Sequence, residues 1–196
     1  MSRKAVFWTS LFIALLFIVP FLGGTYNRLV KREEAVKMAW AQVENQYQRR
    51  ADLILNLVET VKGYAAHEQE TFRKVTKARV QATQMQIDAE NLSAENMQQF
   101  NEAQGELSQA LSRLMMVLEN YPELKANENF ILLQGQLEGT ENRISTERKR
   151  FNETVNKYNT YRRRFPRNIA AAVLGFSKKD YFEADGGTNI SPEVAF

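Results

Sequence analysis

AVFWTSLFIALLFIVPFLGG, residues 5–24, is an unbroken uncharged apolar run, and it decides how this chain is built. At about 1.5 Å per residue, a helix of this length spans roughly 30 Å, the thickness of the hydrocarbon core of a bilayer. Trp8 and Tyr26 lie near its two ends, and aromatic rings favour the headgroup zone. The sequence therefore predicts an N-terminal segment and transmembrane anchor over residues 1–24, with membrane lipids contacted through residues 5–24.

A cleaved signal peptide is the competing interpretation of this run. Signal peptides have an apolar core of about 7 to 15 residues and end in small residues before the cut. This run is longer and ends in Phe21-Leu22-Gly23-Gly24, which favours a retained anchor. Lys and Arg are nearly balanced on its two sides and the chain has no cysteine, so neither charge nor redox chemistry decides which side of the membrane the domain occupies.

The rest of the chain has the composition of one all-α domain. Good helix formers dominate, and nine Gly and four Pro are too few for a turn-rich β protein. Apolar residues recur every seven positions along stretches expected to be helices, near 25–66, 94–121 and 127–165, with a weaker pattern over 68–88. Such seams bury themselves against other helices. Ser93 and Asn127 can cap helices, and Pro122 and Pro166 are expected to end them.

Short connections make neighbouring helices antiparallel. The predicted fold is therefore all-α: an N-terminal transmembrane helix followed by an antiparallel up-down-up-down four-helix bundle with long helices, over residues 25–166. The second and third helices are too short to reach back along the first, so the fourth must cover its membrane-proximal half. Residues 167–185 are expected to form an apolar and basic docking segment, and residues 186–196 a flexible tail whose end, Val194-Ala195-Phe196, is a weak candidate for recognition.

Arg50 interrupts the apolar seam of the first helix. It falls about fifteen residues before the distal end of that helix, and Glu141 falls about fourteen residues after the start of the fourth, so the two should lie at one height. Burying a guanidinium without a partner is strongly unfavourable. We predict a buried structural ion pair between Arg50 and Glu141, with Asp52 as the alternative acid and extension of Arg50 to solvent as the other outcome.

Charge is distributed unevenly although the net charge is only +3. Residues 84–141 contain ten acidic and two basic residues, whereas residues 143–179 contain eleven basic and two acidic. The predicted topology returns this basic end to the membrane, where each Lys or Arg contributes about 1 kcal/mol near an anionic surface. We expect a lipid-facing basic patch of Arg162, Arg163, Arg164 and Arg167. A solvated helix face is the plain alternative, and nucleic-acid binding is not expected.

No group of residues has the spacing of a catalytic, cofactor-binding or metal site. The only histidine, His67, begins HEQET, which lacks the second imidazole of a zinc-protease helix. The Glu-x-x-His pairs of a di-iron bundle are missing too. We therefore expect no catalytic residues, no metal, no cofactor and no enzymatic activity, with His67 in a turn at the distal tip.

Several segments resemble the LemA family of bacterial membrane proteins. They are QRRADLILNLVETVKGYAAHE (48–68), ENYPELKANENF (119–130), EGTENRISTERKRFNETVNKYN (138–159) and KKDYFEA (178–184). The resemblance implies a four-helix bundle behind one span in the bacterial inner membrane, with a short extracellular N-terminus and a cytoplasmic domain, and it supplies no activity. Leu55 stands where family members often have Pro, so the first helix is expected to be straighter there.

The leading hypothesis is a single-pass membrane-anchored scaffold or adaptor that binds unidentified membrane or envelope protein partners. The alternative is a transmembrane sensor, which needs the span and the first helix to be continuous, and an enzyme ranks third. The sequence identifies no partner and leaves homo-oligomerisation open.

Overall fold

The computed structural model describes residues 3–65, 67–85, 87–89 and 92–182, and in these ranges the chain is all-helical, as predicted, with no strand. The helices are α1 (Arg3–Lys62), α2 (Gln69–Gln84), α3 (Ala94–Leu118), α4 (Pro122–Lys125), α5 (Glu128–Arg163) and α6 (Arg167–Val173). After α6 the chain continues without regular structure through Phe182. The predicted tail, 186–196, and its Val194-Ala195-Phe196 end lie outside the described residues.

α1 is one unbroken helix that joins the apolar N-terminal run to the rest of the domain. It continues through Pro20 and the Gly23-Gly24 pair without a break. Among the described residues, α1 is the one helix that contains a stretch long and apolar enough to cross a membrane. None of the residues in that stretch is buried in the protein. From Leu29 to Val61 the apolar residues of the seam are buried. One helix therefore exposes its apolar side chains at one end and buries them at the other.

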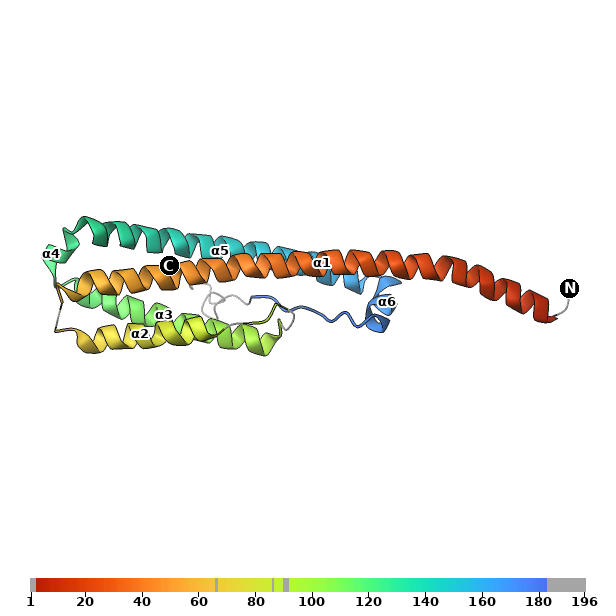
Figure 1. Ribbon diagram of the computed structural model, residues 1–196, viewed down its shortest axis with the longest axis horizontal. Helices are drawn as coiled ribbons and strands as arrows, with labels where there is room; N and C mark the ends of the chain where they lie inside the picture. The colour runs from red at the N-terminus through yellow and green to blue at the C-terminus, as the bar shows by residue number, and fades with distance from the viewer. Residues whose placement is uncertain (1–2, 66, 86, 90–91, 183–196) are drawn as a thin grey trace, which may run out of the picture.

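The helices pack mainly as two pairs, α1 with α5 and α2 with α3, and α2 also contacts α1. Figure 1 shows α1 and α5 side by side along most of the domain, with α2 and α3 beside only the half that is distal to the N-terminus. Successive long helices run in opposite directions, and α6 lies where α1 leaves the other helices and continues alone. The fourth predicted helix therefore reaches back beside the part of α1 that α2 does not cover.

Several helix ends differ from those expected from the sequence. α2 ends at Gln84 rather than near residue 88, because the connection turns Ile87 and Leu92 into the core. α3 ends at Leu118, and three turn hydrogen bonds at residues 119–121 follow it. Pro122 begins the one-turn helix α4, where its missing N–H costs nothing. The predicted caps are present: Ser93 Oγ accepts from the Asn96 N–H (3.3 Å), and Asn127 Oδ1 accepts from the Phe130 N–H (3.1 Å).

The buried apolar residues form two separate clusters. The proximal core lies nearer the apolar run and includes Leu29, Trp40, Phe100, Phe151 and Phe182. The distal core includes Leu57, Val61, Leu107, Leu114 and Leu137. Between them, buried polar side chains project from three helices: Arg50 from α1, Gln104 from α3 and Thr140 from α5. This polar layer divides the interior of the domain into two halves.

Candidate functional site

Arg50 is the centre of the polar layer, and its side chain is 5% exposed. Its Nε lies 2.8 Å from Glu141 Oε1, so the structure brings the predicted pair together, although the Nε–H does not point along a hydrogen bond to that oxygen. Arg50 Nη2 also donates to Ser108 Oγ at 2.6 Å, which joins α1 to α3. The Glu141 side chain is half exposed. Asp52, the alternative acid, accepts from Arg79 of α2 at 3.5 Å.

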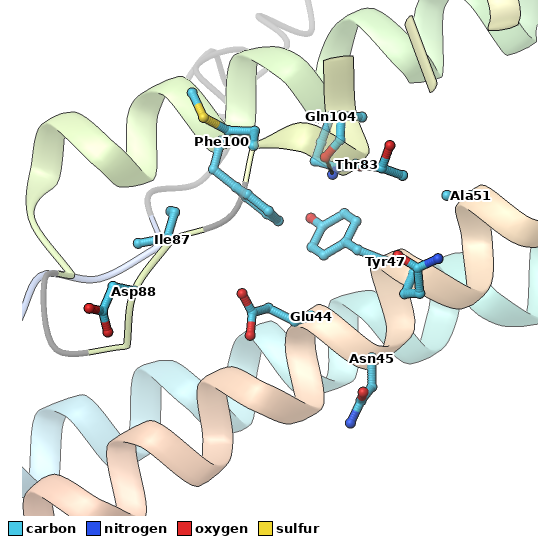
Figure 2. A pocket seen from close by; sticks show the side chains of 12 residues that line it. Glu44, Asn45, Tyr47, Ala51, Thr83, Ile87, Asp88, Phe100 and Gln104 are labelled. Atoms are coloured by element: carbon cyan, nitrogen blue, oxygen red, sulfur yellow. Dashed lines mark hydrogen bonds between the residues drawn. The ribbon is translucent and has the colours of Figure 1, made fainter. Parts of the chain in front are cut away.

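A pocket of about 610 Å³ opens beside this polar layer. It lies between α1, α3, the end of α2 and the connection that follows α2. Figure 2 shows Glu44 and Tyr47 of α1 reaching toward Phe100 of α3 across the pocket, with Gln104 one turn farther along α3. Ile87, from the connection, lines another wall.

Burial controls the electrostatics of this pocket. It raises the pKa of the Glu44 carboxyl, and the nearby Trp40 indole opposes that change. It also raises the pKa of the Tyr47 phenol, with Arg148 and Arg50 acting in the opposite direction. Gln104 donates to the Ala82 carbonyl (3.3 Å), while its Oε1 is buried without a hydrogen-bond partner. The pocket therefore offers one acid that resists ionisation, one phenol and one buried acceptor.

This set of groups can bind a ligand, but it has no nucleophile paired with a base. Across the residues that the structure describes, no three His, Cys, Asp or Glu side chains are placed to share a metal ion. His67 is exposed in the turn between α1 and α2, at the distal tip. The arrangement provides contacts between helices and a binding recess.

Side-chain to backbone hydrogen bonds hold residues 176–182 as an extended segment along α5. The two side-chain atoms of Asn152 bond both backbone groups of Phe182, donating to its carbonyl (3.0 Å) and accepting from its N–H (2.9 Å). Asn159 makes the same pair of bonds with Lys179, at 2.7 and 3.1 Å. The two asparagines are seven residues apart, so they lie on one face of α5. They satisfy backbone groups that an isolated extended chain cannot satisfy itself.

Two buried side chains of this segment contact α1. Lys179 Nζ lies 3.1 Å from Glu33 Oε1, with the two side chains 5% and 24% exposed. The Phe182 ring stacks on Trp40, with centroids 5.5 Å apart, and meets Phe151 edge to face at 5.4 Å. The segment therefore forms part of the proximal core, and residues 176–182 of the predicted docking segment pack against the helices.

The four arginines of the predicted basic patch separate into two groups. Arg162 Nε donates to the Phe176 carbonyl (2.8 Å), and the Arg167 guanidinium lies over the Tyr161 ring, 4.4 Å from its centroid. Arg163 and Arg164 are exposed. All four lie at the end of α5 or the start of α6, beside the point where α1 leaves the domain. Two of them are therefore available to an external anion, and two organise the protein.

The comparison with protein families is decisive for identity. The model of the LemA family matches residues 39–196. The chain belongs to the LemA family. Similar proteins include magnetosome protein MamQ 1 of Paramagnetospirillum magneticum, 27% identical over 87% of this chain and 70% of its own length. Magnetosome protein MamQ of Magnetospirillum gryphiswaldense is 27% identical over 93% of this chain and 75% of its own length. Protein LemA of Metamycoplasma hominis is 22% identical over 88% and 78%.

LemA family membership, these relatives and the exposed apolar helix are consistent with a membrane location. The family model covers Asn152, Asn159 and the pocket residues, whereas Glu33 lies before the matched range. The sequence did not predict the pocket, or the paired backbone hydrogen bonds of Asn152 and Asn159, which we call the asparagine clamps. It also did not predict that Lys179 pairs with Glu33. One signal was present: Glu33 occupies the seam of the first helix just as Arg50 does, and a second seam charge implies a second buried partner. The seven-residue spacing of Asn152 and Asn159, each next to a seam residue, was a weaker signal.

Proposed function

We propose that this LemA family protein is a single-pass scaffold or adaptor of the bacterial inner membrane, which binds protein partners and catalyses no reaction. In this proposal residues 5–24 cross the bilayer once, and α1, α2, α3 and α5 act together as an up-down-up-down four-helix bundle. Lipid surrounds the span, and the bundle presents its outer surface to protein. The boundaries at residues 24, 166 and 185 remain predictions.

The observation that carries the proposal is the continuity of α1. One helix holds exposed apolar side chains over its first part and an apolar seam that is buried from Leu29 to Val61. From Thr25 to its end at Lys62, it extends about 57 Å at 1.5 Å per residue. A helix of this kind would hold the distal end of the domain at a fixed distance from the bilayer, which suits a platform that positions a partner.

Exposed apolar side chains at the distal end give this platform a candidate contact surface. Ile131 and Leu132, in the first turn of α5, are 55% and 59% exposed, and Met116 near the end of α3 is 61% exposed. Large exposed apolar side chains that gather in one region are typical of protein-binding surfaces. Their position far from the span makes lipid an unsuitable partner for them.

Cross-linking in intact membranes tests the scaffold proposal. The full chain with a C-terminal tag is cross-linked before detergent extraction, and the covalent products are compared with those of a variant carrying Ile131→Glu and Leu132→Glu. We expect discrete adducts from the wild type that this variant loses, whereas Lys125→Glu, at an exposed neighbouring site, retains them. Identical products from all three chains, or no adduct from the wild type, would contradict the scaffold.

A transmembrane sensor is the second candidate, and the unbroken passage of α1 through Gly23 and Gly24 favours it. A sensor needs a stiff junction between the span and the domain at Gly23 and Gly24, whereas the scaffold needs only the rigid stretch of α1 that follows Thr25. Insertion of a flexible Gly-Ser stretch after Gly24 separates the two roles. Unchanged adducts with a lost cellular phenotype would support the sensor, and retention of both would support the tethered scaffold.

A further inference from the structure

The exposed face of α6 and Phe165, in the turn two residues before it, are apolar and lie beside the end of the span. Ile169 and Val173 are 58% and 77% exposed, and their spacing of four residues places them on one side of α6. Phe165 is 80% exposed, and together these three side chains form the apolar stripe. The opposite side of α6 is covered, because Ala170 and Ala171 are 3% and 1% exposed. α6 is therefore docked on the domain through small residues and directs its large apolar side chains outward.

The stripe lies at the level where α1 emerges from its apolar run. α6 contacts both α1 and α5, and the ring of Phe176, just beyond α6, meets Tyr26 edge to face at 5.8 Å. Thr25, one residue past the run, is buried at 3% exposure. If residues 5–24 fill the hydrocarbon layer, as proposed above, these contacts place α6 at the boundary between hydrocarbon and headgroups.

Basic side chains flank the stripe on the same level. Arg163 and Arg164 are exposed just before it, and Arg28 and Lys31 are exposed on α1. Arg162 and Arg167 are occupied in contacts within the protein. An apolar strip bordered by cations is the arrangement that binds the interface of an anionic bilayer, with rings and aliphatic groups below the headgroups and guanidinium groups beside the phosphates.

We propose that Phe165, Ile169 and Val173 insert into the bilayer leaflet from which α1 emerges, with Arg163 and Arg164 paired to lipid phosphates. This inference rests on the proposed membrane anchoring of the chain and extends it. The domain then has two membrane contacts, a span and an interfacial helix, and the Tyr26 and Phe176 rings meet between α1 and the segment that follows α6. Two contacts fix the tilt and rotation of the domain relative to the membrane, which one span alone does not.

The chain has no cysteine, so one introduced thiol can be labelled without ambiguity. The full chain carrying Val173→Cys is labelled with an environment-sensitive fluorophore and reconstituted into vesicles of phosphatidylcholine and phosphatidylglycerol that contain a lipid-attached quencher. Met116→Cys, which is comparably exposed but at the distal end, is the matched control. We expect a blue-shifted emission at position 173 and quenching several-fold stronger than at position 116.

Equal quenching at the two positions, in vesicles that retain the protein through an alkaline carbonate wash, would overturn the α6 inference and leave the anchor intact. A blue-shifted label at position 173 that lipid quenchers do not reach would indicate a polypeptide on the stripe, and would overturn it too. Loss of the protein in the wash contradicts the anchor instead, and quenching at position 173 before the wash would then support α6 independently.

The arginines are tested in the same labelled chain. Arg163→Gln combined with Arg164→Gln is expected to weaken quenching at position 173 in vesicles with phosphatidylglycerol and to leave it unchanged in phosphatidylcholine alone. An equal effect in both lipids would show that these arginines do not distinguish an anionic from a zwitterionic headgroup, and would overturn their pairing with anionic lipid. Circular dichroism and the response at position 116 verify that the domain of the double variant is folded.

Discussion

The proximal and distal halves of the domain differ in the side chains and the chain segments that form their cores. In the distal half four helices supply the core, and its residues are largely aliphatic, such as Leu57, Leu107 and Leu114. In the proximal half α2 is absent and α3 only begins, so residues 176–182 complete the core as an extended segment. Large rings occupy this half, with Trp40, Phe100, Phe151 and Phe182 forming one connected cluster.

The difference shows how the proximal core of this helical domain is covered although α2 and α3 are short. An extended chain makes no internal hydrogen bonds, so helix side chains must satisfy its backbone, and the asparagines of α5 do so. A single strand-like segment also covers less area than a helix, and rings compensate because each buries about 150–250 Å². The proximal half thus depends on a few residues near the C-terminus, whereas the distal half depends on many interchangeable aliphatic contacts.

Truncation of Phe182 tests this dependence most strongly. Phe182→Ala removes a ring that is 5% exposed and contacts three other rings. We expect the free energy of unfolding to fall by about 3 kcal/mol, the usual cost of deleting a buried phenyl ring. The measurement is urea unfolding of the full chain in detergent, followed by circular dichroism and by the fluorescence of Trp40.

Phe165→Ala is the matched control, because that ring is 80% exposed and its loss should change stability by less than about 0.5 kcal/mol in detergent. Hydrogen exchange locates the effect. Amides in the proximal part of α5 should lose protection in Phe182→Ala, while those around Leu114 should keep it. A uniform loss over both halves would mean that the two cores are not separate units.

The polar layer between the halves gives the next largest effect. Glu141→Ala leaves the Arg50 guanidinium buried without its carboxylate, and we expect a loss of about 2 kcal/mol, less than for a fully buried pair because Glu141 is half exposed. Arg50→Met removes the charge itself and is expected to be nearly neutral. Chemical unfolding of both single variants and the double variant completes a cycle. An additive double variant would show that the pair contributes nothing.

The sequence was sufficient for the parts of the fold that a periodic pattern encodes. The run at residues 5–24 and the seven-residue seams predicted an all-helical chain with an apolar N-terminal helix, and both predictions are confirmed. Arg50 was informative because a charge in an apolar seam demands a partner, and its height in the predicted bundle indicated Glu141, with Asp52 and solvent left as alternatives. Membership of the LemA family, expected from several segments, is also confirmed.

The features that could not be predicted from the sequence depend on contacts that follow no periodic pattern of residues. Residues 176–182 have no regular structure, so no spacing indicates where Phe182 packs. The end of α2 is set by Ile87 and Leu92 entering the core, a tertiary effect that local propensity does not contain. The basic patch was predicted as one surface, but Arg162 bonds a carbonyl of the C-terminal segment, which only the folded path of that segment creates.

The asparagine clamps give a smaller effect that sharpens the comparison. Asn152→Ala and Asn159→Ala each remove two hydrogen bonds to the extended segment, and we expect each to cost about 1–2 kcal/mol. Asn156→Ala, on the exposed face of the same helix, is the matched control and should cost far less. Hydrogen exchange at the Phe182 and Lys179 amides measures the effect site by site. Unchanged protection in both variants would mean that rings alone hold the segment.

Alkaline pH provides the mildest test of the proximal half, through Tyr158. Its hydroxyl donates to the Ser177 carbonyl (2.8 Å), and burial, followed by the nearby Glu33 carboxylate, raises the pKa of Tyr158 to about 12 from the ordinary value of 10.0. The fold therefore favours the neutral phenol. Its contribution to stability is complete below pH 10 and is lost as the pH rises from 10 towards 12, because the unfolded chain releases its proton first.

Tyr158→Phe should cost about 1 kcal/mol at neutral pH through the lost hydrogen bond. Above pH 10 the stability of this variant should fall less steeply than that of the wild type, because the titrating phenol is gone. Tyr26→Phe, in which a 46% exposed ring loses its hydroxyl, should follow the slope of the wild type. Urea midpoints measured from pH 8 to 11 for the three chains decide between the outcomes. Parallel curves for Tyr158→Phe and the wild type would mean that the segment at Ser177 separates from the Tyr158 phenol before the phenol titrates. The extended segment would then be the least stable part of the proximal half.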